Sequence, residues 1–462
     1  MKNGITFIAV IGAILLGLIF LKVIINPDNG SKLSGNENSL EERGEIKNEL
    51  INQDTESDIL SGPTYNCKPI DGHQYYRTDR TFVIDPTNSD IIYVNVEHKG
   101  FFKSVDGGET WALKTKGIKT YGREDDPTKP CYGEYPVALI NPKDPNYIIL
   151  ALSGTPSTFD FGYTKVGGIV ASTDGAENWK QIVDNWMNIY VTDVVIDPRD
   201  PEVLYYGTVA QAASYTEADP NKIFVTKGLV YKTQDGGQTW EELPTGFIID
   251  SSATAIYINP EDSQEILITT YRAPRPQPGQ GRDTSNTEQM GFLRSFDGGQ
   301  TWEAIHSLPD GFEAVLESAV SPNNYKHVFV SPYAPLGEMS KSFYSTDGAL
   351  SFSQTNIFIE IATFDPHDET GNRLLGYQRT TTGSNLPAIY ESNDAGATWI
   401  KIADAPKEII DNTMLLNQAS KIVWDPIDKN TVYLSGAGGY VWKSIDRGKS
   451  WQTILSLDKL PD

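Results

Sequence analysis

Seven aspartates recur through this 462-residue chain in one short phrase, which reads approximately S-x-D-x-G-x-T-W. They lie 47 to 68 residues apart, at Asp106, Asp174, Asp235, Asp297, Asp347, Asp394 and Asp446. Carboxylates can act as general acids or bind metal ions, but that chemistry needs them to converge on one pocket. Here each carboxylate belongs to its own repeat and is usually followed by glycine. We therefore interpret the seven aspartates as structural turn stabilisers that accept backbone N–H bonds.

The elements that carry these turns are short β-strands. Each Asp phrase lies between two β-patterned runs, which is the signal for a hairpin, and its closing tryptophan supplies an apolar plate for packing. Phe352 replaces the tryptophan in the fifth copy, and Ala176 and Ala349 replace a glycine in the second and fifth copies. These departures predict less regular turns in those two copies.

A second phrase, an apolar strand that ends in Asp, Asn or Ser followed by proline, precedes each Asp phrase. Its copies are Asp85-Pro86, Asn141-Pro142, Asp197-Pro198, Asn259-Pro260, Ser321-Pro322, Asp365-Pro366 and Asp425-Pro426. Proline cannot donate to a sheet ladder, so it marks a turn between two strands. Each repeat therefore predicts four strands, and seven repeats predict an all-β, seven-bladed β-propeller over residues 65–462. The last repeat carries four strands of its own, so we expect the ring to close without a shared blade.

The Asp phrase resembles the Asp-box, or BNR, repeat. Through this motif the chain is similar to the propellers of sialidases, xyloglucan-type glycoside hydrolases, sortilin-like receptors and photosystem II assembly factors. The resemblance implies four-stranded blades whose hairpins are Asp boxes. It implies no single activity, because enzymes and non-enzymes share the motif.

The N-terminus has the pattern of a membrane anchor. Residues 1–4 carry positive charge at Lys2, and residues 5–25 form an apolar run long enough for one transmembrane signal-anchor helix. Residues 26–64 are rich in Gly, Ser, Asn and Glu, which predicts a flexible acidic stalk. The positive-inside rule places residues 1–4 in the cytoplasm and the propeller on the extracytoplasmic side of the cell membrane. A cleaved signal peptide is the alternative.

Overall charge and the remaining reactive residues exclude several functions. A formal net charge of −23 argues against nucleic acid as a partner, because phosphate binding needs clustered Lys and Arg. The five histidines are scattered without metal-ligand spacing, so we expect neither a transition-metal site nor a cofactor. Cys67 and Cys131 are candidates for one disulfide if the propeller is exported, and two free cysteines are the alternative.

Loop lengths indicate which face of the propeller binds a ligand. The turns that hold the two phrases are short. Long loops occupy 117–134, 153–168, 210–228, 272–290, 332–341 and 377–387. Long loops in a compact domain are usually functional, so we expect a polypeptide or glycan ligand on the face opposite the Asp boxes. The candidate ligand contacts are Arg123, Tyr132, Glu134, Tyr215, Arg272, Arg275, Tyr377 and Arg379.

A catalytic role would need further residues. A sialidase would need three arginines around its substrate, for which Arg77, Arg272 and Arg379 are candidates, but its usual entry motif is absent. The resemblance to xyloglucan-type hydrolases places Glu97 where those enzymes have a catalytic aspartate, although they use two propellers and this chain has one. The sequence leaves the enzymatic status open and favours a membrane-anchored, non-catalytic recognition or assembly platform. The alternative is a glycoside hydrolase, xyloglucan-hydrolase-like or sialidase-like, that acts on extracellular oligosaccharides with Glu97 as acid or base.

Overall fold

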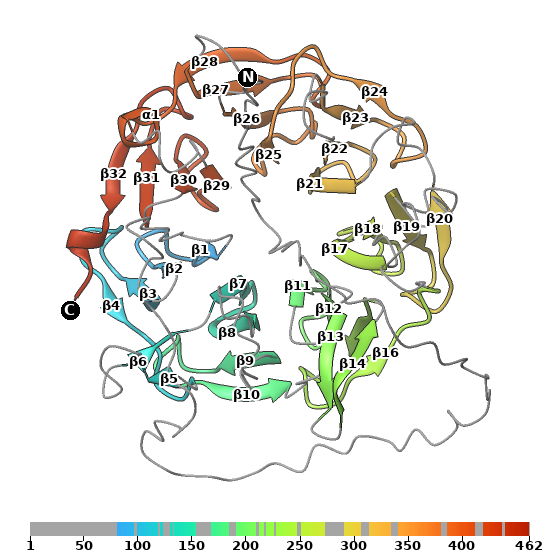
Figure 1. The fold of residues 1–462 in the computed structure, drawn as a ribbon. Helices are drawn as coiled ribbons and strands as arrows, with labels where there is room; N and C mark the ends of the chain where they lie inside the picture. The colour runs from blue at the N-terminus through green and yellow to red at the C-terminus, as the bar shows by residue number, and fades with distance from the viewer. Residues whose placement is uncertain are drawn as a thin grey trace, which may run out of the picture.

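Seven antiparallel blades of four strands each surround a central axis (Figure 1). The computed structural model describes residues 81–96, 99–118, 121–122, 130–132, 134–153, 168–183, 191–208, 212–216, 219–225, 228–246, 251–272, 291–305, 314–333, 341–379, 386–411, 419–436 and 439–461. The prediction of an all-β, seven-bladed propeller is confirmed.

The strands of each blade follow one another from the axis outward. Blade 1 consists of β1 (Phe82–Ile84), β2 (Ile92–Val96), β3 (Gly100–Ser104) and β4 (Ala112–Leu113), and blade 2 of β7 (Glu134–Asn141), β8 (Asp144–Ser153), β9 (Gly168–Ser172) and β10 (Lys180–Val183). Blade 3 consists of β11 (Val191–Ile196), β12 (Leu204–Thr208), β15 (Val230–Thr233) and β16 (Glu241–Glu242), and blade 4 of β17 (Ser251–Ile258), β18 (Ile266–Arg272), β19 (Gly291–Ser295) and β20 (Glu303–Ile305). Blade 5 consists of β21 (Ala314–Val320), β22 (Val328–Tyr333), β23 (Phe343–Ser345) and β24 (Ser353–Gln354).

The last two blades complete the ring. Blade 6 consists of β25 (Ile361–Phe364), β26 (Leu374–Gln378), β27 (Ala388–Ser392) and β28 (Ile400–Asp404), and blade 7 of β29 (Ala419–Trp424), β30 (Val432–Gly436), β31 (Tyr440–Ser444) and β32 (Gln452–Leu455). Outside the blades lie the hairpins β5 (Tyr121–Gly122) with β6 (Pro130–Cys131) and β13 (Ala212–Thr216) with β14 (Asp219–Val225), the short helix α1 (Lys407–Asp411) and a 3₁₀ turn, η3 (Leu457–Lys459).

Apolar side chains pack between neighbouring blades. Phe101 of blade 1 meets Trp179 of blade 2 edge to face, with 5.6 Å between ring centroids. Phe329 of blade 5 meets Trp399 of blade 6 in the same way, at 5.5 Å. Both tryptophans are the last residue of an Asp box, so the box supplies the large apolar side chain for packing that its sequence predicts.

The ring closes by packing between blades 1 and 7, and among the described strands none from one of these blades enters the other. Trp111 Nε1 donates to the carbonyl of Ile454 at 3.4 Å, and Ser89 Oγ donates to Asp425 Oδ1 at 2.6 Å. The side chains of Phe82 and Tyr433 lie in the same apolar cluster. The expectation of a ring with no shared blade is therefore confirmed.

Each box aspartate is bonded within its own turn. In the first copy, Asp106 Oδ1 accepts the Ser104 hydroxyl at 2.8 Å and the backbone N–H of Thr110 at 2.9 Å. Asp106 Oδ2 accepts the Thr110 hydroxyl. These bonds hold the pKa of Asp106 down at about 2, chiefly through the Thr110 hydroxyl. The same contacts recur in the other six copies, which supports their interpretation as turn stabilisers.

The second and fifth Asp boxes are as regular as the others, so the prediction of irregular turns there is wrong. Asn178 Nδ2 donates to Asp174 Oδ2 at 2.7 Å, and thus replaces the usual threonine hydroxyl. Ala176 and Ala349 adopt positive φ angles of 74° and 69°, in a position where other copies have glycine. The side-chain bonds of each box hold this left-handed backbone even where a Cβ atom is present.

Each Asp box packs against the strand-connecting turn of its own blade. The backbone N–H of Gly107, which follows Asp106, donates to the carbonyl of Asp90 at 2.9 Å. In the seventh blade, the N–H of Arg447 donates to the carbonyl of Asn430 at 2.9 Å. An equivalent bond is present in every blade. Both kinds of turn therefore lie on one face of the disc, which we call the Asp-box face; the opposite one is the loop face.

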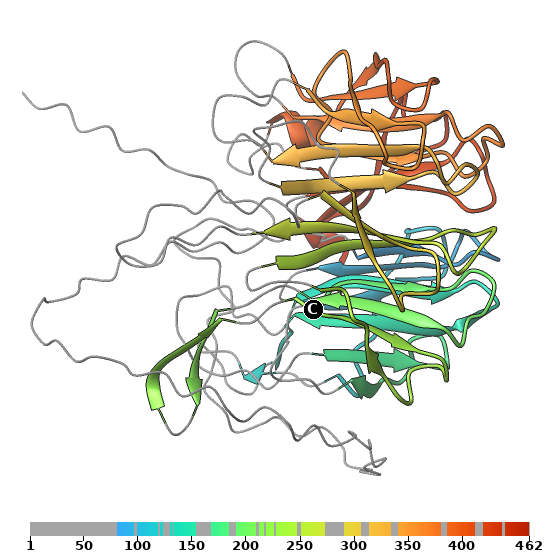
Figure 2. The ribbon, with the colours of Figure 1, turned by 90° about the vertical axis from the view of Figure 1, so that its right-hand side faces the viewer.

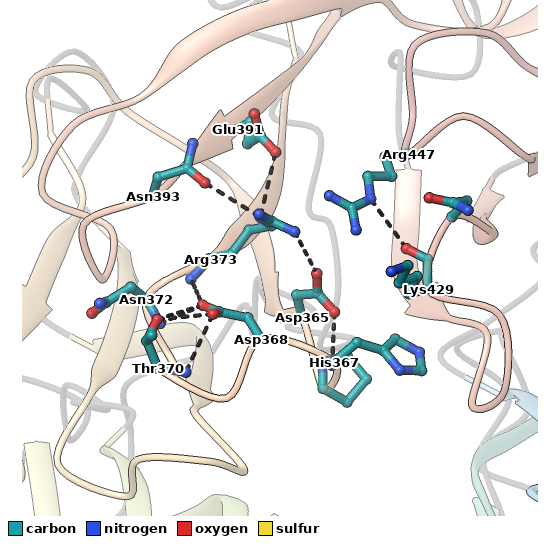
Figure 3. A network of polar contacts seen from close by, with 12 residues as sticks. Asp365, His367, Asp368, Thr370, Asn372, Arg373, Glu391, Asn393, Lys429 and Arg447 are labelled. Carbon is teal, nitrogen blue, oxygen red and sulfur yellow. Dashed lines mark hydrogen bonds and ion pairs between the residues drawn. The ribbon is translucent and has the colours of Figure 1, made fainter.

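Polar groups on the Asp-box face between blades 6 and 7 are well bonded (Figure 3). Asp368 accepts the backbone N–H of Arg373 at 2.7 Å, and fully buried Asp365 accepts the backbone N–H of His367 at 2.8 Å. The guanidinium of Arg373 also lies 3.3 Å from Asp365 Oδ2. His367 Nε2 lies 2.8 Å from the carbonyl of Asp425 in blade 7. The carboxylates of Asp365 and Asp368 therefore already have partners within this part of the Asp-box face.

The N-terminal predictions concern residues that precede the described part of the chain. In that part, which begins at Thr81, no helix has the length and apolar character to cross a membrane. The predicted anchor at 5–25 and stalk at 26–64 lie outside the described residues and stay predictions.

Candidate functional site

The loop face lies at the ends of the blades where the inner strands begin. The β13–β14 hairpin is inserted between the second and third strands of blade 3 and stands off the disc on this side (Figure 2). Its backbone lies within the predicted long loop at 210–228. This described insertion supports the interpretation that the loop face is the elaborated one.

Three predicted ligand contacts have described side chains. Tyr132 is half-buried, and its hydroxyl accepts a bond from Thr115 Oγ1 at 3.3 Å. Tyr377 is fully buried and packs in the apolar cluster between blades 6 and 7. Arg379 follows β26 with 21% of its side chain exposed. Among these three described side chains, Arg379 is the one that combines charge with access to solvent.

The remaining predicted site residues stay predictions. Residues outside the described part of the chain are Glu97, Arg123, Arg275 and Cys67. Residues described only by their backbone, in β7, β13, β18 and β6, are Glu134, Tyr215, Arg272 and Cys131.

Each blade has one equivalent residue pair in its loop-side half. The first residue of the pair lies on the innermost strand, four positions before the Asp, Asn or Ser that precedes the proline of the Pro turn. The second residue lies opposite it on the next strand. In blades 2 to 7 these pairs are Val137 with Ala151, Asp193 with Gly207, Ala255 with Thr269, Glu317 with Ser331, Ile361 with Tyr377, and Lys421 with Ser435. In blade 1, the backbone bond from Asn95 to Thr81 sets the equivalent pair. We call this set the loop-side layer.

Several buried polar atoms without a hydrogen-bond partner lie in or beside this layer, while Trp424 Nε1 and Trp451 Nε1, which also have none, lie outside it. Among the described residues they include the side-chain amide of Asn95 and the hydroxyls of Ser331 and Ser435. Thr192 Oγ1 and Glu360 Oε2, which also have no partner, belong to the residue just before the inner-strand position of the layer. Each such group costs about 1–3 kcal/mol, so their concentration at one level of the fold calls for a functional explanation.

One part of the loop-side layer combines these polar atoms with charge, at the interface of blades 5 and 6. Glu317 and Ser331 are opposed in the β21–β22 ladder, so their side chains lie on the same side of the sheet. Phe329, two residues before Ser331, packs against Trp399 of blade 6, which shows that this side faces blade 6. Glu360 and Arg379 border it from blade 6. We call Glu317, Ser331, Glu360 and Arg379 the blade 5/6 cluster.

Glu360 is bonded on one oxygen only. Its Oε1 lies 3.4 Å from Arg379 Nε, and the backbone N–H of Arg379 also bonds to this carboxylate. Its own N–H donates to the carbonyl of Tyr377 at 2.9 Å, so the residue is held firmly at the start of β25. Oε2 is buried without a partner. The carboxylate therefore has one oxygen bonded to Arg379 and one buried oxygen without a hydrogen-bond partner.

Electrostatics favour the neutral form of Glu360. Burial raises the pKa of this carboxyl to about 7, Arg379 opposes the rise, and the charge of Glu317 adds to it. A carboxyl that changes its charge near neutral pH beside a second carboxylate is a frequent feature of functional sites.

Within the described residues, no group of three or more His, Cys, Asp or Glu side chains is placed to hold a metal ion.

Comparison with known proteins identifies the repeat. A family model described as BNR/Asp-box repeat matches residues 293–304, which contain the whole fourth box. The chain is an Asp-box β-propeller. A xyloglucanase from Paenibacillus sp is 24% identical over 346 residues, which cover 69% of this Asp-box propeller and 31% of the enzyme. The propeller thus spans about a third of that relative's length.

Solved structures share the fold of the Asp-box propeller at low identity. The GH74 xyloglucanase from Xanthomonas campestris superposes with a TM-score of 0.55 and 14% identity, over 83% of this chain and 55% of that chain. YCF48 bound to D1 peptide superposes with a TM-score of 0.49 and 13% identity, over 81% of this chain and 94% of that chain. At 14% identity the likeness to the xyloglucanase concerns the fold alone.

Sequence reasoning missed three of the four residues in the blade 5/6 cluster. Arg379 was predicted from its place in a long loop, whereas Glu317, Ser331 and Glu360 lie in or beside strands. A signal was present, because Glu317 lies four residues before Ser321 where five of the other six repeats have no acidic residue. An alignment of the seven repeats on their Pro turns would have revealed this unusual acidic residue.

Proposed function

We propose that this Asp-box propeller is a non-catalytic recognition platform that binds a polypeptide or glycan through its loop face. The observation that carries the proposal is the distribution of buried polar atoms. Box aspartates on the Asp-box face have partners within their own turns, whereas several oxygen and amide groups in or beside the loop-side layer are buried without one. Buried polar groups that the chain itself leaves unpaired are suited to a ligand that pairs them.

The proposal includes the setting of the propeller. The apolar run at 5–25 serves as a single-pass anchor in the cell membrane, and the acidic stalk at 26–64 holds the disc on the extracytoplasmic side. The net charge of −23 keeps nucleic acid from being the partner.

Binding by the full chain tests this function. The chain is screened against an oligosaccharide library and a peptide library, and the affinity of each hit is measured for two variants with the same change of charge. Arg379→Gln alters the loop face, and Arg447→Gln alters the Asp-box face. We expect Arg379→Gln to weaken binding about tenfold or more and Arg447→Gln to leave it unchanged. Equal effects of the two variants, or no hit in either library, would refute the proposal.

The second candidate function is a glycoside hydrolase, xyloglucan-hydrolase-like or sialidase-like. It is supported by the sequence similarity to xyloglucanases and by the carboxyl of Glu360, whose pKa of about 7 suits a general acid next to the carboxylate of Glu317. Release of reducing ends from xyloglucan oligosaccharides tests it. Turnover that is lost in Glu360→Gln or Glu97→Gln would establish hydrolysis, and binding without turnover would leave the recognition platform.

A further inference from the structure

We propose that an acidic segment near the N-terminus, residues 40–58, docks on the Asp-box face of blade 7. The surface that receives it consists of Ile427, Lys429, Ile445 and Lys449, which we call the blade 7 patch. The contact is intramolecular and does not depend on a ligand at the loop face. It goes beyond the proposed function because it assigns the N-terminal segment to one face of the disc and leaves the other face open.

The seventh Asp box differs from the others in charge. Each of the other six boxes carries one or two acidic residues and no lysine or arginine. The seventh reads S-I-D-R-G-K-S-W, which adds Arg447 and Lys449 to its aspartate. Lys429 lies in the Pro turn of the same blade, and Arg447 Nε donates to its carbonyl at 3.2 Å, which holds the two turns together (Figure 3). Blade 7 therefore brings added positive charge to the Asp-box face of a chain whose net charge is −23.

The two lysines of the blade 7 patch have no role in the fold. Lys429 and Lys449 are exposed, and neither side chain forms an ion pair with a described residue. Lys443 of the same blade, by contrast, lies over the ring of Tyr433 at 5.4 Å from its centroid. The nearby carboxylate of Asp428 accepts bonds within its own turn. The patch thus offers two ammonium groups to a partner while the neighbouring carboxylate is engaged.

Two exposed isoleucines accompany these lysines. Ile427 is 56% exposed and Ile445 is 71% exposed. Ile427 directly follows the proline of its turn, and in the other six repeats this position is polar: Thr87, Lys143, Arg199, Glu261, Asn323 and His367. Apolar side chains beside charged ones are typical of a surface that contacts another polypeptide. The blade 7 patch therefore has both the charge and the apolar surface of a docking site.

The neighbouring blades limit the width of the partner. Blade 1 carries exposed Asp90 and Glu109 on the Asp-box face, and blade 6 carries exposed Glu369. A flat anionic surface, such as a lipid bilayer, would bring its charges against these carboxylates as well as against the lysines of blade 7. A single polypeptide segment is narrow enough to contact blade 7 alone. The patch therefore fits an acidic segment of chain.

Residues 40–58 have the complementary composition. They hold seven acidic and two basic residues, and their apolar residues are Leu40, Ile46, Leu50 and Ile51. This acidic segment belongs to the stalk predicted from the sequence and lies outside the described residues. Its carboxylates complement the two lysines of the patch, and its apolar side chains complement the two isoleucines.

The connection to the propeller is long enough for this contact. Thr81 lies at the loop-side end of the innermost strand of blade 1, and 22 residues separate it from the acidic segment. Fully extended, these residues span roughly 70 Å, whereas a blade is about 15 Å across its four strands and about 17 Å along a five-residue strand. The segment can therefore reach the Asp-box face around the rim. The tether also gives it a local concentration on the order of mM, which favours it over a free acidic peptide.

Zero-length cross-linking of the full chain in detergent micelles tests the inference. A carbodiimide joins lysine amines to carboxylates that touch them, and mass spectrometry of the digest identifies the linked peptides. We expect Lys429 and Lys449 to be linked to the acidic segment. Lys326, an exposed lysine on the same face of blade 5, should be linked to it about tenfold less. Equal linkage of the three lysines would refute the docking.

Two matched pairs of variants test the patch itself. Ile445→Asn and Phe296→Asn each remove an exposed apolar side chain at the second position of an Asp box, in blades 7 and 4. Lys449→Glu and Lys326→Glu each reverse one exposed charge, in blades 7 and 5. We expect the links between Lys429 and the acidic segment to fall about threefold in the two blade 7 variants and to stay unchanged in the other two.

Other occupants of the patch would give different results. In a mixture of ordinary and nitrogen-15-labelled protein, links that join the two isotopes would assign the patch to a second copy. Links that disappear when phosphatidylglycerol vesicles are added would assign it to an anionic membrane. Unchanged links in both blade 7 variants would also overturn the inference. None of these measurements involves a ligand at the loop face, so any of these outcomes leaves the recognition platform intact.

Discussion

Glu360 Oε1 lies 3.4 Å from Arg379 Nε, while Glu360 Oε2 is buried and has no hydrogen-bond partner. A second buried ion pair in the same ring shows how unusual this is. Glu265 pairs with Arg294 through Oε1, and its Oε2 accepts Asn259 Nδ2 at 2.6 Å. Both carboxylate oxygens of Glu265 are thus bonded, as expected for a structural ion pair, whereas only one carboxylate oxygen of Glu360 is bonded.

The pKa of Glu360 should respond to its two charged neighbours in opposite directions. Arg379→Gln removes the charge that stabilises the ionised carboxylate, so the pKa rises above about 7. Glu317→Gln removes the like charge, so the pKa falls. Carbon-13 NMR of the side-chain carboxyl, assigned through Glu360→Gln, measures both changes. Shifts of the same sign in the two variants would show that the charges of the cluster do not act on Glu360.

Stability should depend on pH through Glu360. Its folded pKa of about 7 exceeds the ordinary value of 4.5, so the folded chain binds more protons between these limits and the free energy of unfolding falls as the pH rises through them. Glu360→Gln removes this loss. We expect the variant to gain about 3 kcal/mol over the wild type at pH 8 and almost nothing at pH 4. Denaturant unfolding at both pH values measures it, and a gain at pH 4 as large as that at pH 8 would contradict the mechanism.

The loss of stability at low pH should come in part from the Asp boxes. The Thr301 hydroxyl is the largest of the bonds that hold the pKa of Asp297 at about 2, below the ordinary 3.8. This contribution is fully present above pH 3.8 and is lost as the pH falls toward 2. Thr301→Val should raise the pKa of Asp297, measured by NMR, whereas Thr301→Ser should leave it low. An unchanged pKa in Thr301→Val would assign the shift to the backbone bonds alone.

Ring closure should be sensitive to one added methyl group. A Cβ atom on Gly108 would lie 2.9 Å from Ile454 Cδ1 of blade 7, whereas one on Gly107 would be no closer than 3.4 Å to any atom, with Asp90 Oδ1 the nearest. Both glycines have positive φ, so alanine strains the backbone at either position. We expect Gly108→Ala to cost about 1–3 kcal/mol more than Gly107→Ala, because only the former overpacks the junction. Denaturant unfolding compares the two, and equal losses would mean that the junction adapts freely.

The fold could be predicted almost entirely because its signals are local. An Asp-Gly turn, a Pro turn and a closing tryptophan each act within about ten residues, and their sevenfold repetition leaves one architecture. The error at the second and fifth boxes has a physical reason. A sequence motif records the usual residues of a turn, but Asn178 makes the same bond as threonine and Ala176 fits the same left-handed backbone.

The sequence by itself determined the seven-bladed ring, the turns that build it and the face that carries the long loops. Tertiary structure decided which residues of that face share a site. Glu317 and Glu360 are 43 residues apart and belong to different repeats. Only the packing of blade 5 on blade 6 brings their carboxylates close enough for the two charges to interact. Likewise Tyr377, a plausible ligand contact on a loop, is buried because the register of β25 and β26 turns its ring into the core. Burial and charge depend on contacts between distant segments, and no local pattern records them.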